Sequence, residues 1–184
     1  MILSLPVITP RLLLKKESLN DFERFFFMSK DSDAMQYIGD GSIYHWTKKV
    51  AYKKFRARLA RQDNNKPKNL AVYTKEKNLY IGWCGIRYSK FLAHIELGYS
   101  YCTDAWHNGY ATEAASAILT EIYRLTDIDP IMACTHPKNI ASIHVLEKLG
   151  FAYTSSKLSR ASGLNIPVYR IDRKAYEKTI TAKI

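Results

Sequence analysis

The sequence predicts a mixed α/β (α+β) protein, because strand patterns alternate with single helical patterns in the second half of the chain. Residues 93–101 alternate between apolar and polar side chains, which is typical of a strand. Residues 109–125 repeat apolar residues at steps of three and four, which is typical of a helix. The chain has 184 residues, 47% of them hydrophobic, so we expect one packed domain over residues 1–184.

The first 40 residues predict one strand and two short helices. Residues 11–15 form a strand candidate, and Ser18 is the candidate cap of a helix over 21–28. Residues 31–38 are expected to add a further helical turn.

From residue 70 onward the sequence predicts six more strands and two longer helices. The strand candidates are residues 70–74, 79–88, 93–101, 130–134, 151–157 and 168–173. Gly82 and Gly85, inside one of them, predict a bulge or a close backbone approach. The helices are expected over 109–125 and from the cap Asn139 to Leu149.

The net charge is concentrated in one segment. The chain carries 28 Lys and Arg residues against 17 Asp and Glu residues, which gives +11, excludes an acidic scaffold and favours a polyanionic partner. Residues 48–68 hold nine of these cations and one Asp, a net +8. The cations surround an apolar stripe that contains Ala51, Phe55 and Leu59, so we expect an amphipathic helix with a cationic outer face, ended by a polar loop over 63–69.

Cysteine usage and the apolar segments indicate the compartment. Cys84, Cys102 and Cys134 are too few and too scattered for a disulfide framework or a zinc site, and we expect no metal. We expect Cys102 to behave as a small hydrophobe, because no His partner that would activate a nucleophile is visible. The chain shows neither a signal-peptide pattern nor an apolar run long enough for a membrane helix, so we expect a cytoplasmic protein without a membrane partner.

Two strand–turn–helix junctions are the candidate functional sites. The first is the turn Trp106-His-Asn-Gly-Tyr-Ala-Thr112, which opens the longest helix. A helix N-terminus presents unpaired N–H groups, and Gly109 lets the backbone approach a ligand, so this turn is a candidate phosphate site. Taken alone, the turn is more typical of an ordinary connection than of a phosphate site. The second junction is Asn139-Ile-Ala-Ser142-Ile-His-Val-Leu-Glu-Lys-Leu-Gly150-Phe151, which leads directly into a strand.

These junctions and three further motifs resemble the GNAT superfamily of acyl-CoA N-acetyltransferases, and specifically its branch that includes the ribosomal-protein N-terminal (alanine/serine) acetyltransferases. The further motifs are Thr9-Pro-Arg11-Leu-Leu-Leu14, Asp31-Ser-Asp-Ala-Met35-Gln-Tyr-Ile38 and Glu96-Leu-Gly-Tyr99. The likeness covers residues 9–173. It implies a mixed, mostly antiparallel, V-shaped sheet of about seven strands flanked by helices, whose splayed central strands admit acetyl-CoA.

The resemblance also implies which residues bind acetyl-CoA, the expected cosubstrate. The backbone of Tyr99 and Tyr101 would pair with the pantetheine arm in the manner of an added strand. Asn139 would contact the pantetheine from the opposite side. The pyrophosphate would lie against the turn made of His107, Asn108, Gly109, Tyr110, Ala111 and Thr112. His107 stands where the family usually has glycine.

Acetyl transfer needs a neutral amine, so a base is expected. The resembling enzymes often place a carboxylate at the position of Glu96, acting through water; the alternative is that Glu96 only pairs with a nearby cation. His94, on the same face of the strand, is the second candidate base. The tyrosine that commonly protonates the CoA thiolate is replaced by Leu146. Ser142 is the candidate substitute, and its alternative is an ordinary serine at a helix start.

The predicted function is therefore transfer of an acetyl group from acetyl-CoA to a primary amine, on a protein N-terminus or a small molecule, by direct attack. The cationic helix favours an acceptor carried on an acidic protein or a ribonucleoprotein. Two alternatives remain: a basic nucleic-acid- or ribosome-binding module that uses residues 48–68, and a GNAT fold that binds acyl-CoA without turnover. Either a monomer or a homodimer is compatible with the sequence.

Overall fold

Strands and helices alternate along most of the chain in the computed structural model, which describes residues 5–38, 42–60 and 69–181. The strands are β1 (Val7–Ile8), β2 (Leu12–Lys15), β3 (Asn69–Thr74), β4 (Leu79–Ser89), β5 (His94–Tyr101), β6 (Ile131–Cys134), β7 (Ala152–Leu158) and β8 (Asn165–Ile171). The α-helices are α1 (Phe22–Lys30), α2 (Ser32–Met35), α3 (Lys48–Ala60), α4 (Tyr110–Leu125), α5 (Ile140–Lys148) and α6 (Arg173–Thr181). Short 3-10 turns lie at Leu19–Asp21, Ser42–His45 and Thr103–Ala105.

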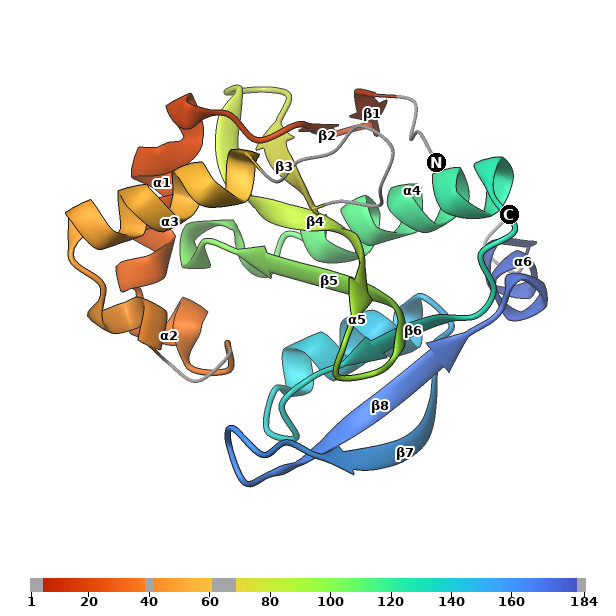
Figure 1. Ribbon diagram of the computed structural model, residues 1–184. Helices are drawn as coiled ribbons and strands as arrows, with labels where there is room; N and C mark the ends of the chain where they lie inside the picture. The colour runs from red at the N-terminus through yellow and green to blue at the C-terminus, as the bar shows by residue number, and fades with distance from the viewer. Residues whose placement is uncertain (1–4, 39–41, 61–68, 182–184) are drawn as a thin grey trace.

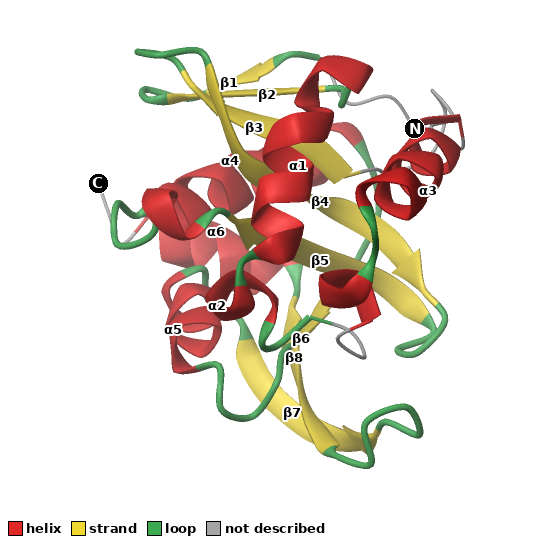
Figure 2. Cartoon of the chain, turned by 90° about the vertical axis from the view of Figure 1, so that its left-hand side faces the viewer, coloured by secondary structure: helices red, strands yellow, loops and turns green. Residues whose placement is uncertain are grey.

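The strands form a single mixed sheet in the order β1-β2-β3-β4-β5-β6-β8-β7. All neighbours are antiparallel except β5 and β6, which are parallel and are connected through α4. Figures 1 and 2 show two arms, one made of β1 to β5 and the other of β6, β8 and β7, which diverge between β5 and β6. The prediction of a mostly antiparallel, V-shaped sheet is confirmed, and the sheet has eight strands because the short β1 extends its first edge.

The main core lies between α4 and one face of the sheet. Of the predicted apolar stripe of α4, Ala115, Ile118 and Ile122 are fully buried, whereas Ala111 is partly buried and Leu125 is exposed at the end of the helix. Ala114 and Leu119 complete the buried face. The core side chains of the sheet include Leu12 and Leu14 from β2, which alternate with partly exposed neighbours as a strand pattern requires. Burial of this stripe fixes α4 against the sheet, and with it the turn that precedes the helix.

A second apolar cluster covers the opposite face of the sheet under α1 and α3. Phe55 of α3 lies 4.7 Å from the ring of Phe25 and 5.8 Å from that of Phe22, both in α1. Trp83 of β4 packs against the same cluster. The predicted cationic helix is therefore real and is attached through α1, and Figure 1 shows it on the outside of the molecule.

Most elements begin and end within three residues of their predicted limits, and the differences have local causes. The bulge expected at Gly82 is confirmed by a register shift opposite Val72 and Tyr73, whereas Gly85 is regularly paired. A side chain at Gly82 would come within 2.2 Å of the Ser100 carbonyl oxygen. Of the polar loop predicted over 63–69, residues 63–68 lie outside the described part of the chain.

The sequence reading missed α6, although it contains a usable signal. Asp172 precedes the helix and accepts a hydrogen bond from the Ala175 N–H at 2.9 Å. Tyr176 and Ile180 follow at helical spacing, and Tyr176 is buried. In the part of the chain that the structure describes, no helix combines the length and the apolar composition needed to cross a membrane.

A buried ion pair joins α3 to the segment after β2. Arg58 donates a hydrogen bond to Glu17, whose side chain is 1% exposed. The Arg58 guanidinium also lies over the ring of Phe25 at 4.8 Å. Burial raises the pKa of Glu17 to about 7; the positive charge of Arg58 opposes this shift and the charge of nearby Asp21 adds to it.

We expect Glu17→Gln to change the pH dependence of stability. The pKa of Glu17 is about 7 in the folded chain against a usual 4.5, so the folded state binds this proton more tightly. The contribution of Glu17 to the free energy of unfolding is therefore highest below pH 4.5 and decreases as the pH rises through 7. At about 1.4 kcal/mol per pKa unit, the loss amounts to roughly 3 kcal/mol. Urea denaturation from acidic pH to about pH 8 measures it as the difference between wild type and variant.

Glu23→Gln is the matched control, because the Glu23 side chain is 70% exposed and pairs with Lys48 on the surface. The free energy of unfolding of this variant should change with pH in the same way as that of wild type. If the Glu17→Gln profile is also parallel to wild type, the raised pKa of Glu17 is wrong.

Candidate active site

The sheet opens between β5 and β6. The two strands share a single register pair, Glu96 with Met132. Beyond it, β5 continues to Tyr101 paired with β4 on one edge, and on its other edge it has no strand from the described part of the chain. Because β5 and β6 are parallel and each leads into a helix, the N-termini of α4 and α5 lie at the same end of the sheet as the opening.

The backbone of β5 presents hydrogen-bonding groups to this opening. The Cys102 N–H donates to the Ile81 carbonyl of β4 at 2.9 Å, and backbone groups of alternate residues face opposite edges of a strand. The N–H and C=O groups of Tyr99 and Tyr101 therefore face away from β4, as an added strand requires. The Tyr101 carbonyl already accepts a hydrogen bond from the Trp106 indole N–H at 3.0 Å. Tyr99 is thus the residue that keeps both backbone groups available.

The turn before α4 forms a cradle of backbone N–H groups. Those of residues 107–112 donate to no other residue that the structure describes. His107 (φ +62°) and Gly109 (φ +74°) both have left-handed backbone conformations, which turn successive N–H groups toward one side. The side chain of Asn108 holds the turn by donating to the carbonyls of Ala105 (3.3 Å) and Trp106 (2.8 Å). The cradle fits a phosphate, and its occupant stays a prediction.

Arg11 stands beside this cradle, and the sequence reading gave it no role there. A side chain atom built on Gly109 would lie 3.6 Å from the Arg11 guanidinium, which also covers the ring of Tyr110 at 4.8 Å. Glu113 holds Arg11 in place, with 2.6 Å between the charged groups. Burial alone would raise the pKa of Glu113, but hydrogen bonds from Thr9 and Arg11, together with the charge of Arg11, lower it. The motif Thr9-Pro-Arg11 pointed to this segment, but its contact with α4 spans about a hundred residues of sequence.

Glu96 lies where the sheet opens, on the face opposite the α4 core. Arg87 of β4 is the cross-strand neighbour of Glu96 and places a guanidinium nitrogen 3.3 Å from one carboxylate oxygen. The Cys134 thiol, at the end of β6, donates to the other oxygen at 3.2 Å. Burial and the adjacent negative charge of Glu96 raise the pKa of Cys134 to about 12, so Cys134 is a neutral donor. Glu96 does pair with a nearby cation, and whether it also acts as a base stays a prediction.

Ser142, Tyr99 and Asn139 meet on the other face of the opening. The Tyr99 hydroxyl is 3.1 Å from the Ser142 hydroxyl and 3.2 Å from its carbonyl oxygen. Burial raises the pKa of Tyr99, so its hydroxyl is protonated at neutral pH. The Asn139 side-chain oxygen accepts from the Ser142 N–H at 3.1 Å, which confirms Asn139 as the cap of α5. The Asn139 amide N–H groups bond to no other described residue and remain available to a ligand.

The remaining candidates fall outside this arrangement. His94 is exposed at the far end of β5, two residues before Glu96. Leu146 is 1% exposed in the main core. Cys102 is fully buried, and burial raises its pKa to about 11, so it is not a nucleophile at neutral pH. Among the described residues, no cluster of three or more His, Cys, Asp or Glu side chains could hold a metal ion.

The helices α1 and α2 are connected to both sides of the opening. On the β5 side, the Thr103 hydroxyl donates to Asp31, which also caps α2. On the β6 side, the ring of Tyr37 stacks on that of His136 with 4.9 Å between centroids. The segment from α1 to residue 38 therefore bridges the opening on the face that carries Glu96.

This architecture and site define the class of protein. Residues 11–152 match the family model described as the acetyltransferase (GNAT) domain. An uncharacterized N-acetyltransferase of Bacillus subtilis, YnaD, is 28% identical over 145 residues, which cover 78% of this chain and 81% of that protein.

Solved structures share the fold. The acetyltransferase (GNAT family) from Bacillus anthracis superimposes with a TM-score of 0.76 at 24% identity, covering 92% of this chain and 99% of that one. A ribosomal L7/L12 alpha-N-protein acetyltransferase, RimL, solved in complex with coenzyme A, gives a TM-score of 0.76 at 15% identity and covers 92% and 98%.

The chain belongs to the GNAT acetyltransferase family. It is an N-acetyltransferase, as the sequence motifs predicted.

We expect Gly109→Ala to weaken CoA binding by several-fold. The substitution places a side chain on a backbone at φ +74°, which costs about 1 kcal/mol and disturbs the alignment of the N–H groups in the cradle. Gly163→Ala is the matched control, since Gly163 has φ +68° and nothing lies within 4 Å of an added side chain. Both variants should lose similar stability in urea denaturation, but only Gly109→Ala should lose CoA affinity in calorimetry. Equal CoA affinity in both variants would contradict the cradle.

Proposed function

We propose that this enzyme transfers the acetyl group of acetyl-CoA to a primary amine by direct attack, and that the amine is a protein N-terminus. One observation carries the proposal: Glu96 is the last residue of β5 that pairs with β6, so its carboxylate stands at the mouth of the opening. An amine that reaches Glu96 from one face would meet a thioester held from the other.

The residues of the opening fit acetyl-CoA, which supplies the activated acetyl group. The N–H groups of residues 107–112, with Arg11 beside them, would bind the pyrophosphate. The open edge at Tyr99 and the free amide of Asn139 would hold the pantetheine arm on its two sides.

Glu96 is the proposed base. A protonated α-amine has a pKa of about 8, so it must lose one proton before its nitrogen attacks the carbonyl carbon. We assign that proton to Glu96 through a water molecule, with Arg87 and the Cys134 thiol holding the carboxylate. The C–N bond then forms, the C–S bond breaks and the sulfur leaves with the electron pair. The nitrogen loses a second proton through water, and this proton replaces the one that the leaving sulfur takes from the hydroxyl groups of Ser142 and Tyr99.

The leaving thiolate is proposed to receive a hydrogen bond and then a proton from the pair formed by Ser142 and Tyr99. Both are neutral hydroxyl groups that touch each other at the start of α5. This pair would replace the tyrosine whose usual place is taken by Leu146, which is buried in the core.

A protein N-terminus is favoured over a small polycation because the face that leads to Glu96 is cationic. Arg87 is half-exposed beside Glu96, and α3 on the same face carries six Lys and Arg residues and no acidic residue. Like charges would repel a polyamine. The relative RimL, named for an alpha-N-protein activity, fits this acceptor class.

Three further features belong to the proposal. Residues 1–184 form one acetyltransferase domain, in the cytoplasm, where its three free cysteines stay reduced. The enzyme acts as a monomer or a homodimer. It needs no metal, because Glu96 and the hydroxyl pair supply the proton transfers.

The second candidate is a GNAT fold that binds acyl-CoA without turnover. It is favoured by the environment of Glu96, because both carboxylate oxygens already have protein partners, Arg87 and Cys134. A carboxylate so engaged can serve to connect β4, β5 and β6 without accepting a proton.

We expect Glu96→Gln to lower kcat by about 10²- to 10³-fold, because the amine loses its base. KM for acetyl-CoA should stay within about twofold, since Glu96 does not contribute to the cradle. His94→Gln, the matched substitution two residues away, should leave kcat near wild type. CoA release from acetyl-CoA with a panel of N-terminal peptides measures both.

A large loss of kcat in His94→Gln, with kcat of Glu96→Gln near wild type, would assign the base to His94. Saturable CoA binding without turnover of any peptide or amine would support the second candidate.

A further inference from the structure

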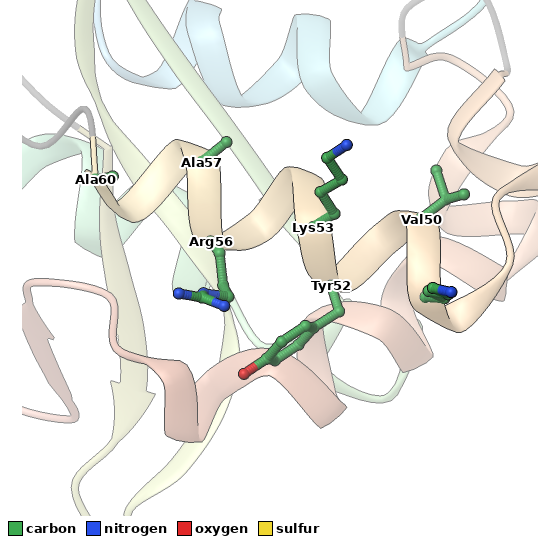
Figure 3. Close-up of a pocket in the computed structure, with 7 residues that line it drawn as sticks. Val50, Tyr52, Lys53, Arg56, Ala57 and Ala60 are labelled. Carbon is green, nitrogen blue, oxygen red and sulfur yellow. The ribbon is translucent and has the colours of Figure 1, made fainter.

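The charged side chains on the outward face of α3 are all positive. Its exposed residues, which we name the cationic face, are Lys49, Val50, Lys53, Arg56, Ala57 and Ala60. Together with Tyr52, they line a shallow, open hollow of about 580 Å³ on the side of α3 that faces away from the sheet. Figure 3 shows Lys53 and Ala57 projecting from the helix, whereas Tyr52 points toward the neighbouring helix.

The Lys and Arg side chains of α3 differ in whether they contact another residue. Lys48 pairs with Glu23 at 2.8 Å, Arg58 pairs with Glu17, and Lys54 covers the ring of Trp46 at 4.7 Å. These contacts are at the flanks and on the inner side of the helix. On the cationic face, Lys49 and Lys53 have no ion pair or hydrogen bond with any residue in the described ranges, and Arg56 has only a ring contact at 6.0 Å.

This arrangement costs helix stability. Lys49 and Lys53 are four residues apart and repel each other by about 0.2–0.5 kcal/mol. Lys48 and Lys49 also place positive charge on the first turn of α3, where the helix dipole disfavours it. An ordinary solvated face would relieve this cost with an acidic residue, and α3 has none. The cationic face is therefore better explained by an anionic partner than by solubility.

The composition of the face favours a polypeptide over nucleic acid. Val50, Ala57 and Ala60 place small apolar side chains beside the cations, which suits the apolar positions of an acidic amphipathic helix. A nucleic acid would use an aromatic ring as a stacking platform. Tyr52, the ring that lines the hollow, is 39% exposed, but it packs edge-to-face with Phe22 at 4.9 Å and the Arg56 guanidinium lies over it at 6.0 Å.

The cationic face and Glu96 lie on the same side of the sheet. α3 packs on α1, and Trp83 of β4 packs against the cluster that these helices form. The Arg87 guanidinium, 6.0 Å from the Trp83 ring, then reaches Glu96. A chain lying along α3 thus has a continuous protein surface toward the opening.

We propose that the cationic face of α3 docks an acidic, amphipathic segment of the acceptor protein, while the N-terminus of that protein extends to Glu96. The role of the docked chain as acceptor rests on the proposed function; docking itself does not. The face would raise the local concentration of the acceptor amine and select acceptors by a segment remote from the acetylated residue.

The test uses a synthetic peptide with a free N-terminal serine, a neutral linker and a segment that alternates glutamate with leucine and alanine at helical spacing, labelled at its C-terminus. Fluorescence anisotropy with the full chain, without acetyl-CoA, should show saturable binding that weakens with salt. The triple variant Lys49→Glu, Lys53→Glu, Arg56→Glu should raise the Kd by about tenfold or more. A triple alanine variant at the same positions should lie between it and wild type.

The matched control makes the same charge change elsewhere. Lys77→Glu, Lys174→Glu and Lys178→Glu replace exposed lysines away from α3 and should change the Kd by less than about threefold. If this control weakens binding as much as the α3 triple, net charge alone explains the binding and the docking proposal is overturned. Tighter binding of a single-stranded RNA oligonucleotide, abolished by the α3 triple, would overturn it in favour of nucleic acid.

A second measurement separates docking from catalysis. With acetyl-CoA, the α3 triple should raise KM for the acidic peptide and leave the rate with a short neutral N-terminal peptide unchanged. Acetylation of the short peptide without measurable anisotropy binding of the acidic one overturns docking and leaves the proposed function intact. Peptide binding that depends on α3, without acetylation of any peptide, supports docking and removes the proposed function.

Discussion

The structure depends on keeping β5 and β6 apart after one shared register pair. An exposed strand edge has unpaired N–H and C=O groups and tends to acquire a partner. Here the two helices that follow β5 and β6 enforce the separation. The stripe of α4 from Ala114 to Ile122 is fully buried against the sheet, and α5 contacts β5 through Ser142 and Tyr99. An edge that another fold would have to cover becomes the place where an extended ligand can add itself as a strand.

The cationic side chains on the two sides of α3 differ in whether they have a charged partner. On its inner side, α3 pairs the partly exposed Arg58 with the buried Glu17, and loss of Arg58 would leave the Glu17 carboxylate without a partner or solvent. On its outer side, the same helix exposes Lys49 and Lys53 without a partner among the described residues. The total of +11 therefore says little about the turn before α4, because the groups that this turn presents are mainly backbone N–H groups.

Local patterns predicted the elements well, because they report periodicity and helix ends. The alternation over 93–101 became β5, and the cap at Asn139 became the start of α5. The opening between the strands followed from the family likeness alone, since no residue pattern within β5 or β6 encodes it. What sequence reasoning missed at the site are contacts between distant segments. The spacing of residues along the sequence predicts neither the hydrogen bond from the Cys134 thiol to Glu96 nor the position of Arg11 beside Gly109.

The segment that contains α1 and α2 connects the two sides of the opening between β5 and β6. Asp31 contacts the β5 side of the opening through Thr103, and Tyr37 contacts the β6 side through His136. Because the same short segment contacts both sides, a change in the distance between β5 and β6 would require α1 and α2 to move or one of these two contacts to break. The width of the opening and the position of the helices over Glu96 are therefore geometrically coupled.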